Sequence, residues 1–168
     1  KSLMVGRELS GHYYREDYDT PISEEKVLEV RNLNCPGRFK EINFSLHKGE
    51  ILGFGGLSEA GLHEVARAIF GMEYDVTGEV IVNGQKMKTL KDRLDVKLGY
   101  ISKNRDTESL FNQASIEDNI CITCYPKIAP KNFVTPGKKH KFADEQAKML
   151  KVKMQNVDQE VGALSGGN

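Results

Sequence analysis

The residues with the clearest chemical potential are the glycines of one short loop. Gly56 and Gly61 are separated by four residues, which is the glycine spacing of a phosphate-binding loop. Glycines in such a loop let backbone N–H groups turn inward around phosphate oxygens, and the start of a following helix adds partial positive charge. The apolar run 51–54 before the loop predicts a buried strand, and the amphipathic stretch 62–70 after it predicts a helix that ends at Gly71.

The loop has the glycine spacing of a phosphate loop but lacks the side chains that a working one needs. A working phosphate loop needs Lys to reach the terminal phosphates and then Ser or Thr to ligate Mg²⁺, but this chain has Leu62 and His63 at those two places. Leu62 offers no charge, magnesium prefers oxygen to the imidazole of His63, and Glu59 adds negative charge within the loop. A disabled phosphate loop and a structural glycine turn explain the segment about equally well. A dinucleotide-binding G-x-G-x-x-G loop is disfavoured, because Ser58 stands where it needs glycine.

The cysteines supply a second candidate site. Cys121 and Cys124 have C-x-x-C spacing, and with Cys35 they are the three cysteines of the chain. A zinc site needs a second pair of ligands, and the four histidines show no paired spacing. A redox pair needs a thioredoxin-like setting, which the flanking sequence lacks. The pattern therefore favours two thiols on the apolar side of a segment.

The elements that must position these residues alternate between strands and helices. Strand-like alternation is predicted at 26–31, 39–46 and 77–82, with turn residues at 34–37 and an Asn-Gly turn at 83–84. A further short strand is predicted at 97–102. Helices are expected to begin at Ser115, with Asp118 at the capping-box position, and to run over about 138–153 after a break at Pro136. This order predicts an α/β domain around a mixed sheet.

Composition and charge restrict the function classes. The 168 residues carry 24 Lys and Arg against 24 Asp and Glu, so the electrostatic argument for a nucleic-acid partner is missing. No apolar run approaches the roughly 20 residues that cross a bilayer. Eight lysines lie between residues 126 and 153, and this run is better explained as a solvated helix face than as an anion-binding surface.

The end of the chain carries the most specific pattern. Leu164-Ser165-Gly166-Gly167, followed by Asn168, resembles the signature motif of ABC-transporter ATPases in the form of the sugar-import branch, the ribose, galactose and methyl-galactoside type. Three further segments match the family in the same order. Residues 4–9 resemble the segment that joins two ATPase halves, and residues 49–53 resemble the strand that enters the second half's P-loop. Residues 99–105 and 110–111 resemble the Q-loop region. The resemblance covers nearly the whole chain.

The chain departs from that family at several positions. The second P-loop of such proteins usually has Arg followed by Thr where this chain has Leu62 and His63. The acidic residue of the Q-loop region falls on Lys103, with Asn104 beside it. The resemblance also implies a Walker B strand after the signature motif, so we expect a P-loop NTPase-like core with part of a helical subdomain, truncated before that strand.

The resemblance implies a domain order and a function. We expect residues 1–25 to be a linker between halves, 26–114 a nucleotide-binding core with a degenerate P-loop, and 115–168 a helical subdomain. ABC ATPases hold ATP between one half's P-loop and the other half's signature motif. Ser165, Gly166 and Gly167 are then expected to act on ATP and Mg²⁺ held by a first ATPase half of the same polypeptide, while Gly56, Ser58, Gly61, Leu62 and His63 form the degenerate loop.

The expected protein is the ATP-binding subunit of a sugar importer, peripheral on the cytoplasmic face of the membrane. Its partners are membrane permease subunits and, indirectly, a sugar-binding protein, with no nucleic acid. The alternative is a non-catalytic structural or regulatory domain that docks the partner half and the permease without binding nucleotide. In either case we expect no hydrolysis by this chain alone.

Overall fold

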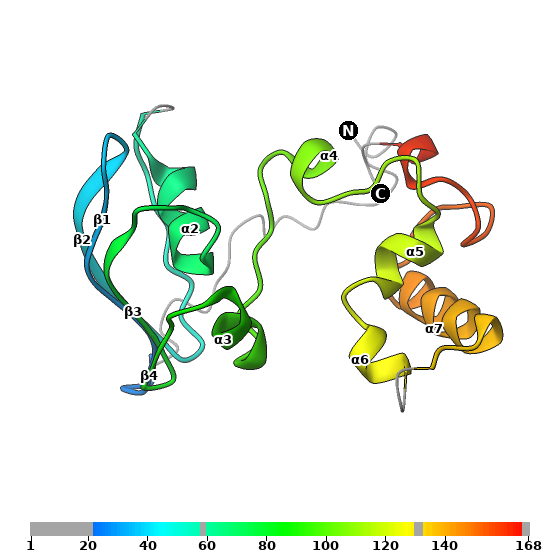
Figure 1. Ribbon diagram of the computed structural model, residues 1–168, viewed down its shortest axis with the longest axis horizontal. Coiled ribbons are helices and arrows are strands. Elements are labelled where there is room, and N and C mark those ends of the chain that lie inside the picture. The colour runs from blue at the N-terminus through cyan, green and yellow to red at the C-terminus, as the bar shows by residue number, and fades with distance from the viewer. Residues whose placement is uncertain (1–21, 58–59, 130–132, 166–168) are drawn as a thin grey trace, which may run out of the picture. The chain divides into compact units, whose positions relative to one another are not determined.

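The computed structural model describes residues 22–57, 60–129 and 133–165. These residues fall into two compact units divided between Tyr100 and Ile101. Each unit has its own hydrophobic core. The ribbon in Figure 1 shows the sheet of the first unit and the helices of the second. Among the described residues, no helix is long and apolar enough to span a membrane.

The first unit contains a four-stranded sheet with the order β2-β1-β3-β4. The strands are β1 (Lys26–Cys35), β2 (Phe39–His47), β3 (Thr77–Val82) and β4 (Gln85–Lys86), and every pair is antiparallel. The turn residues predicted from the sequence connect them. Gly37 has a φ of 74° between β1 and β2, and Asn83 and Gly84, with φ of 48° and 77°, form the tight turn into β4. The α/β class is confirmed, since helices accompany this sheet.

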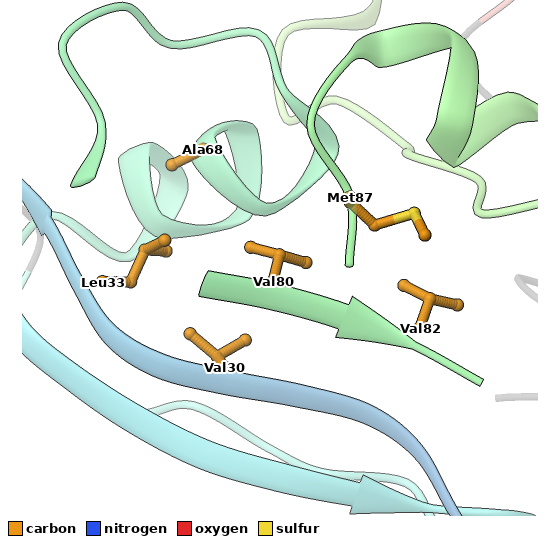
Figure 2. Packing of buried hydrophobic residues seen from close by; sticks show 6 residues of the cluster. All are labelled: Val30, Leu33, Ala68, Val80, Val82 and Met87. Carbon is orange, nitrogen blue, oxygen red and sulfur yellow. The ribbon is translucent and has the colours of Figure 1, made fainter. Parts of the chain in front are cut away.

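The core of the first unit lies between the sheet and α2 (Leu62–Phe70) (Figure 2). Val80 and Val82 of β3 both face inward because side chains of a strand point to opposite faces in turn. In β1 the register shifts between Val30 and Leu33, so both are buried although they are three residues apart. Fully burying one such aliphatic side chain contributes about 1.5–3 kcal/mol. The buried cluster consists of Val30, Leu33, Ala68, Val80, Val82 and Met87.

Two strand predictions, at 51–54 and 97–102, are wrong. Residues 51–57 and 97–102 form no strand, and Ile51 is 81% exposed rather than buried. A strand needs a hydrogen-bonded neighbour, and no described strand pairs with either segment. The ring of Phe54 nevertheless contacts that of Phe44, 5.0 Å away between centroids.

Helix α3 (Leu90–Asp95) ends the regular structure of the first unit. Thr89 Oγ1 accepts a hydrogen bond from the Asp92 N–H (3.2 Å), and the Asp92 carboxylate accepts one from the Thr89 N–H (2.8 Å). Arg93 is buried and donates to the carbonyls of Ile69 (2.6 Å) and Thr89 (2.9 Å). Burial lowers the pKa of Arg93. This arginine therefore ties α3 to the end of α2, where Gly71 has a φ of 87°.

The second unit is helical. It contains α4 (Arg105–Glu108), α5 (Ile116–Cys121), α6 (Tyr125–Ile128), α7 (Pro136–Met149) and the 3-10 turn η2 (Val161–Ala163). Ser115 caps α5 as predicted, since its Oγ accepts from the Asp118 N–H (2.9 Å). The helix predicted over about 138–153 is present as α7, but its bounds differ. The Pro136-Gly137 pair predicted as a break forms its first turn, where the missing N–H of Pro136 leaves no hydrogen bond unmade, and the helix ends at Met149.

Small residues let the helices of the second unit approach closely. Ala143 and Ala147, one turn apart on α7, are fully buried, and Cys121 is equally inaccessible. Burial raises the pKa of the Cys121 thiol, which makes it a core residue rather than a reactive one. The apolar interpretation of this cysteine is confirmed. The buried cluster consists of Cys121, Ile128, Ala143, Ala147 and Val157.

Candidate functional site

The glycine loop of the first unit leads directly into α2. The Ala60 N–H donates to the Leu57 carbonyl (3.0 Å), and Gly61 immediately precedes α2 with a φ of 81°. The predicted helix 62–70 matches α2 residue for residue. Ser58 and Glu59, two positions of interest in the loop, lie outside the described residues.

Gly61 is held by a close backbone contact. A Cβ on this residue would lie 2.9 Å from the Arg38 carbonyl oxygen, closer than real Cβ contacts. Its left-handed φ also disfavours any side chain. Gly61 therefore brings the start of α2 against the β1–β2 hairpin, and the two requirements explain its identity without a phosphate.

The described side chains around the loop lack the groups that usually hold a nucleotide triphosphate. Methyl groups of Leu62 lie 3.7 and 3.9 Å from the position of a Cβ on Gly56, so apolar atoms stand beside this glycine. His63 is exposed on α2. No Lys or Arg occurs from residue 51 to residue 66. Mg²⁺ and a triphosphate need a nearby cation and a hydroxyl ligand, and the described loop residues do not fit them.

The two arginines that come nearest in sequence are already paired. Arg67 Nε donates to Glu73 Oε1 (2.5 Å), and Arg38 pairs with the other oxygen of the same carboxylate. The Glu73 side chain is only 6% exposed. This carboxylate therefore connects the hairpin to α2 and offsets one of the two positive charges of the arginines.

The segment at the end of the second unit is held by backbone hydrogen bonds and ends in an exposed serine. The Val161 N–H donates to the Ala114 carbonyl (3.0 Å) and the Gly162 N–H to that of Asn112 (3.1 Å). A Cβ on Gly162 would lie 2.9 Å from the Asn112 oxygen. Leu164 is half-buried and Ser165 is exposed. The segment before Ser165 is thus docked on the loop that leads into α5, whereas Gly166 and Gly167 lie outside the described residues.

The Q-loop region begins the second unit. Ser102 is buried, its Oγ donates to Glu108 Oε2 (2.5 Å), and it accepts from the Asn104 N–H (3.0 Å). Lys103 and Asn104 are both exposed, and Asn104 directly precedes α4. A cavity of about 640 Å³ lies beside α4, with Arg105 and Asp106 on one side and Leu164 and Ser165 on another. The structure brings α4 and the signature segment together, but neither Lys103 nor Asn104 lines this cavity.

A comparison with known families decides the identity of the fold. The ABC transporter family matches residues 39–168, which is more than half of the chain.

The chain belongs to the ABC transporter family.

Several relatives of the chain carry the same name. The chain is 39% identical over 168 residues to "Ribose import ATP-binding protein RbsA" of Oceanobacillus iheyensis, covering 98% of this chain and 33% of the relative. It is 36% identical to the protein of that name in Corynebacterium glutamicum, covering 99% of this chain and 32% of the relative. The Bacillus subtilis protein of that name is 35% identical, with 98% and 33% covered. The chain spans about a third of the length of these relatives.

Sequence reasoning about this ABC chain missed one cluster of charged residues in the second unit. Lys139 Nζ lies 3.1 Å from Glu117 Oε1 and 2.5 Å from Asp118 Oδ1. The hydrogen bond from Lys139 lowers the pKa of Asp118, and the bond to Asp118 raises the pKa of Lys139. His140, the next residue on α7, places its Nδ1 2.9 Å from Glu117 Oε2.

The spacing of these residues in the sequence does not predict this cluster. Glu117 and His140 are 23 residues apart and meet only because α5 packs on α7. The lysines of residues 126–153 are mostly a solvated face, as the sequence favours. Lys141 and Lys148 form pairs four residues apart on α7, with Glu145 and Asp144.

Proposed function

We propose that this chain is a degenerate nucleotide-binding half of the ATP-binding subunit of a ribose-type sugar importer. Its family membership and the printed names of its relatives support the ATP-binding subunit and the class of cargo. The observation that supports the degenerate role is the glycine loop, which has the glycine spacing of a P-loop before α2 and no Lys or Arg between residues 51 and 66.

The signature segment has the retained role in this proposal. Ser165 offers a hydroxyl and Gly166 and Gly167 offer backbone N–H groups, which are suitable donors to a γ-phosphate. The ATP and Mg²⁺ are held by a first ATPase half of the same polypeptide, and this chain completes that half's site. Docking of Val161 and Gly162 on residues 112–114 holds the segment that leads to Ser165.

The same proposal assigns the domains and the partners. Residues 1–25 link the two halves, 26–114 form the degenerate core and 115–168 the helical subdomain that ends at the signature motif. Lys103 and Asn104 occupy the Q-loop without its acid and take no part in coordinating metal or water. The subunit binds permease subunits at the cytoplasmic face of the membrane and serves a sugar-binding protein indirectly.

A purely structural role is the second candidate. It is favoured by the same loop, because Leu62 beside Gly56 and the acidic Glu64 in the first turn of α2 both oppose phosphate binding. In this case the chain docks the partner half and the permease, and its signature motif makes no contact with nucleotide.

Calorimetric titration of Mg-ATP separates the two candidates. The chain alone should bind ATP more weakly than about 1 mM, about −4 kcal/mol, under either candidate. Together with a first half, wild-type chain should tighten that half's ATP binding, and Ser165→Ala should reduce the gain. A first half whose ATP affinity is the same with and without this chain would favour the structural candidate.

A further inference from the structure

The cluster at the junction of α5 and α7 has the donor set of a metal site. Glu117 of α5, His140 of α7 and Asp158 of the following segment each offer one ligand atom, and these atoms lie within 4.8 Å of one another. Imidazole nitrogen with carboxylate oxygen is a donor combination that Zn²⁺ accepts. We propose that these three residues bind one divalent transition-metal ion of the zinc class.

Two of the three ligand separations are close to those of a tetrahedral ion, and all three lie within 4.8 Å. With bonds of about 2.0–2.2 Å, two ligand atoms of tetrahedral zinc lie about 3.3 Å apart. His140 Nδ1 is 2.9 Å from Glu117 Oε2 and 3.8 Å from Asp158 Oδ1, so the two separations bracket that value. Movements of about half an ångström, mainly by the Asp158 side chain, which is 71% exposed, would satisfy both. Three protein ligands leave one position for water.

The charges around the cluster favour a cation despite the neighbouring lysine. Lys139 contacts Glu117 Oε1, the oxygen that faces away from the His140 contact, and it is shared with Asp118. Glu117, Asp118 and Asp158 against this one ammonium leave two negative charges beside the imidazole of His140. A hydrogen bond to the second oxygen of a ligating carboxylate orients that ligand, which is a common feature of metal sites. Lys139 thus positions Glu117 and does not occupy the site.

The position of the site links it to the signature segment. The Ile116 N–H donates to the Gln159 carbonyl (2.9 Å) and the Glu117 N–H to that of Val157 (2.8 Å), so residues 157–159 already lie along the start of α5. A metal ion on Glu117, His140 and Asp158 would cross-link α5, α7 and this segment. The segment continues through Glu160 into η2 and Ser165. Metal occupancy would therefore restrain the approach to the signature motif.

The first test is zinc binding by the whole chain after treatment with a chelator. Calorimetry should give one Zn²⁺ per chain for the wild type. His140→Ala and Asp158→Asn should each weaken the affinity by about 100-fold or more, because each removes one of three ligands. Both side chains are more than half exposed, so neither variant should unfold the protein.

His47→Ala is the matched control. His47 Nδ1 lies 3.0 Å from Glu50 Oε2, which reproduces the histidine–glutamate contact, and no second carboxylate pairs with His47 among the residues that the structure describes. This variant should bind Zn²⁺ as the wild type does. Equal zinc affinity in the wild type, His140→Ala and Asp158→Asn would overturn the proposal, and so would the absence of zinc binding by the wild type.

Cobalt provides an independent readout that distinguishes the cluster from the cysteines. Co²⁺ in the proposed site should give visible tetrahedral bands without a sulfur-to-cobalt charge-transfer band. Hydrogen exchange at the Ile116 and Glu117 amides should slow when the metal binds. A thiolate band, with exchange at these amides unchanged, would place the metal on cysteine and overturn the assignment.

Discussion

The glycine loop before α2 and the segment before Ser165 share one backbone device and differ in the chemistry they present. In each, a glycine approaches a carbonyl so closely that a Cβ would lie 2.9 Å from the oxygen, that of Arg38 for Gly61 and that of Asn112 for Gly162. The first leads to Leu62 and His63, the second to Ser165. Packing alone therefore explains the glycine at each of these two turns, without any ligand.

This contrast separates what the fold requires from what ligand binding requires. Glu73 joins the two arginines nearest to the loop, and Gly61 fits against the hairpin, so these contacts hold the start of α2 without a ligand. The signature segment is also held by backbone hydrogen bonds, but it ends in an exposed serine. Glycine geometry alone is thus poor evidence for nucleotide binding.

The largest stability effect is expected from Gly61→Ala. The left-handed φ of 81° and the contact with Arg38 add together, and the expected loss is about 3 kcal/mol. Hydrogen exchange of the β1 and β3 core amides measures it. Gly53→Ala is the control, since a Cβ there meets nothing within 4 Å and should change stability by less than about 0.5 kcal/mol. Equal losses for the two variants would refute the packing explanation.

Gly162→Ala should cost less, about 1–2 kcal/mol, because only the contact with Asn112 opposes it and φ is not positive. The loss should be confined to the second unit and appear in the exchange of the Val161 and Ile116 amides. Gly137→Ala on α7 is the matched control, and it should stabilise the unit by up to about 1 kcal/mol through helix propensity. A Gly162→Ala chain as stable as the wild type would contradict the docking.

The two helix caps should give nearly equal effects. Ser115→Ala and Thr89→Ala each remove a side-chain acceptor from the third N–H of a helix, at 2.9 and 3.2 Å. Each should cost about 1 kcal/mol, measured in its own unit by chemical denaturation with local exchange. In the longer protein, only Ser115→Ala should also lower ATPase activity, since α5 supports the signature segment. Equal ATPase losses for both variants would contradict a special role of α5 in supporting the segment before Ser165.

The smallest effect concerns acid. Lys139 lowers the pKa of Asp118 below its ordinary value of 3.8, so the pair stabilises the folded state above that pH. The contribution disappears as the pH falls through the lowered pKa. It is expected to be under about 1 kcal/mol because the pair is partly exposed. Asp118→Asn should therefore be less stable at pH 7 and less sensitive to acid in denaturant titrations; unchanged sensitivity would remove Asp118 as its source.

The sequence predicts local elements well in this protein and long-range arrangements poorly. Helix 62–70 carries its own apolar face and its glycine stop, so its limits are readable. The run at 51–54 has the composition of a strand, yet strand formation depends on a neighbour that its own residues do not encode. The Leu62 and His63 departures are visible by residue type alone. The meeting of Glu117 with His140 depends on helix packing and is not.

The most direct test of the central claim is ATPase activity in a protein of the relatives' full length that contains this chain. Gly166→Asp puts a carboxylate where the proposal requires a hydrogen-bond donor to the γ-phosphate, and we expect ATPase activity to fall about 100-fold. Leu62→Ala changes a loop that holds no nucleotide, and we expect the wild-type rate within about twofold. Gly166→Asp with wild-type activity, or Leu62→Ala with the larger loss, would contradict the account.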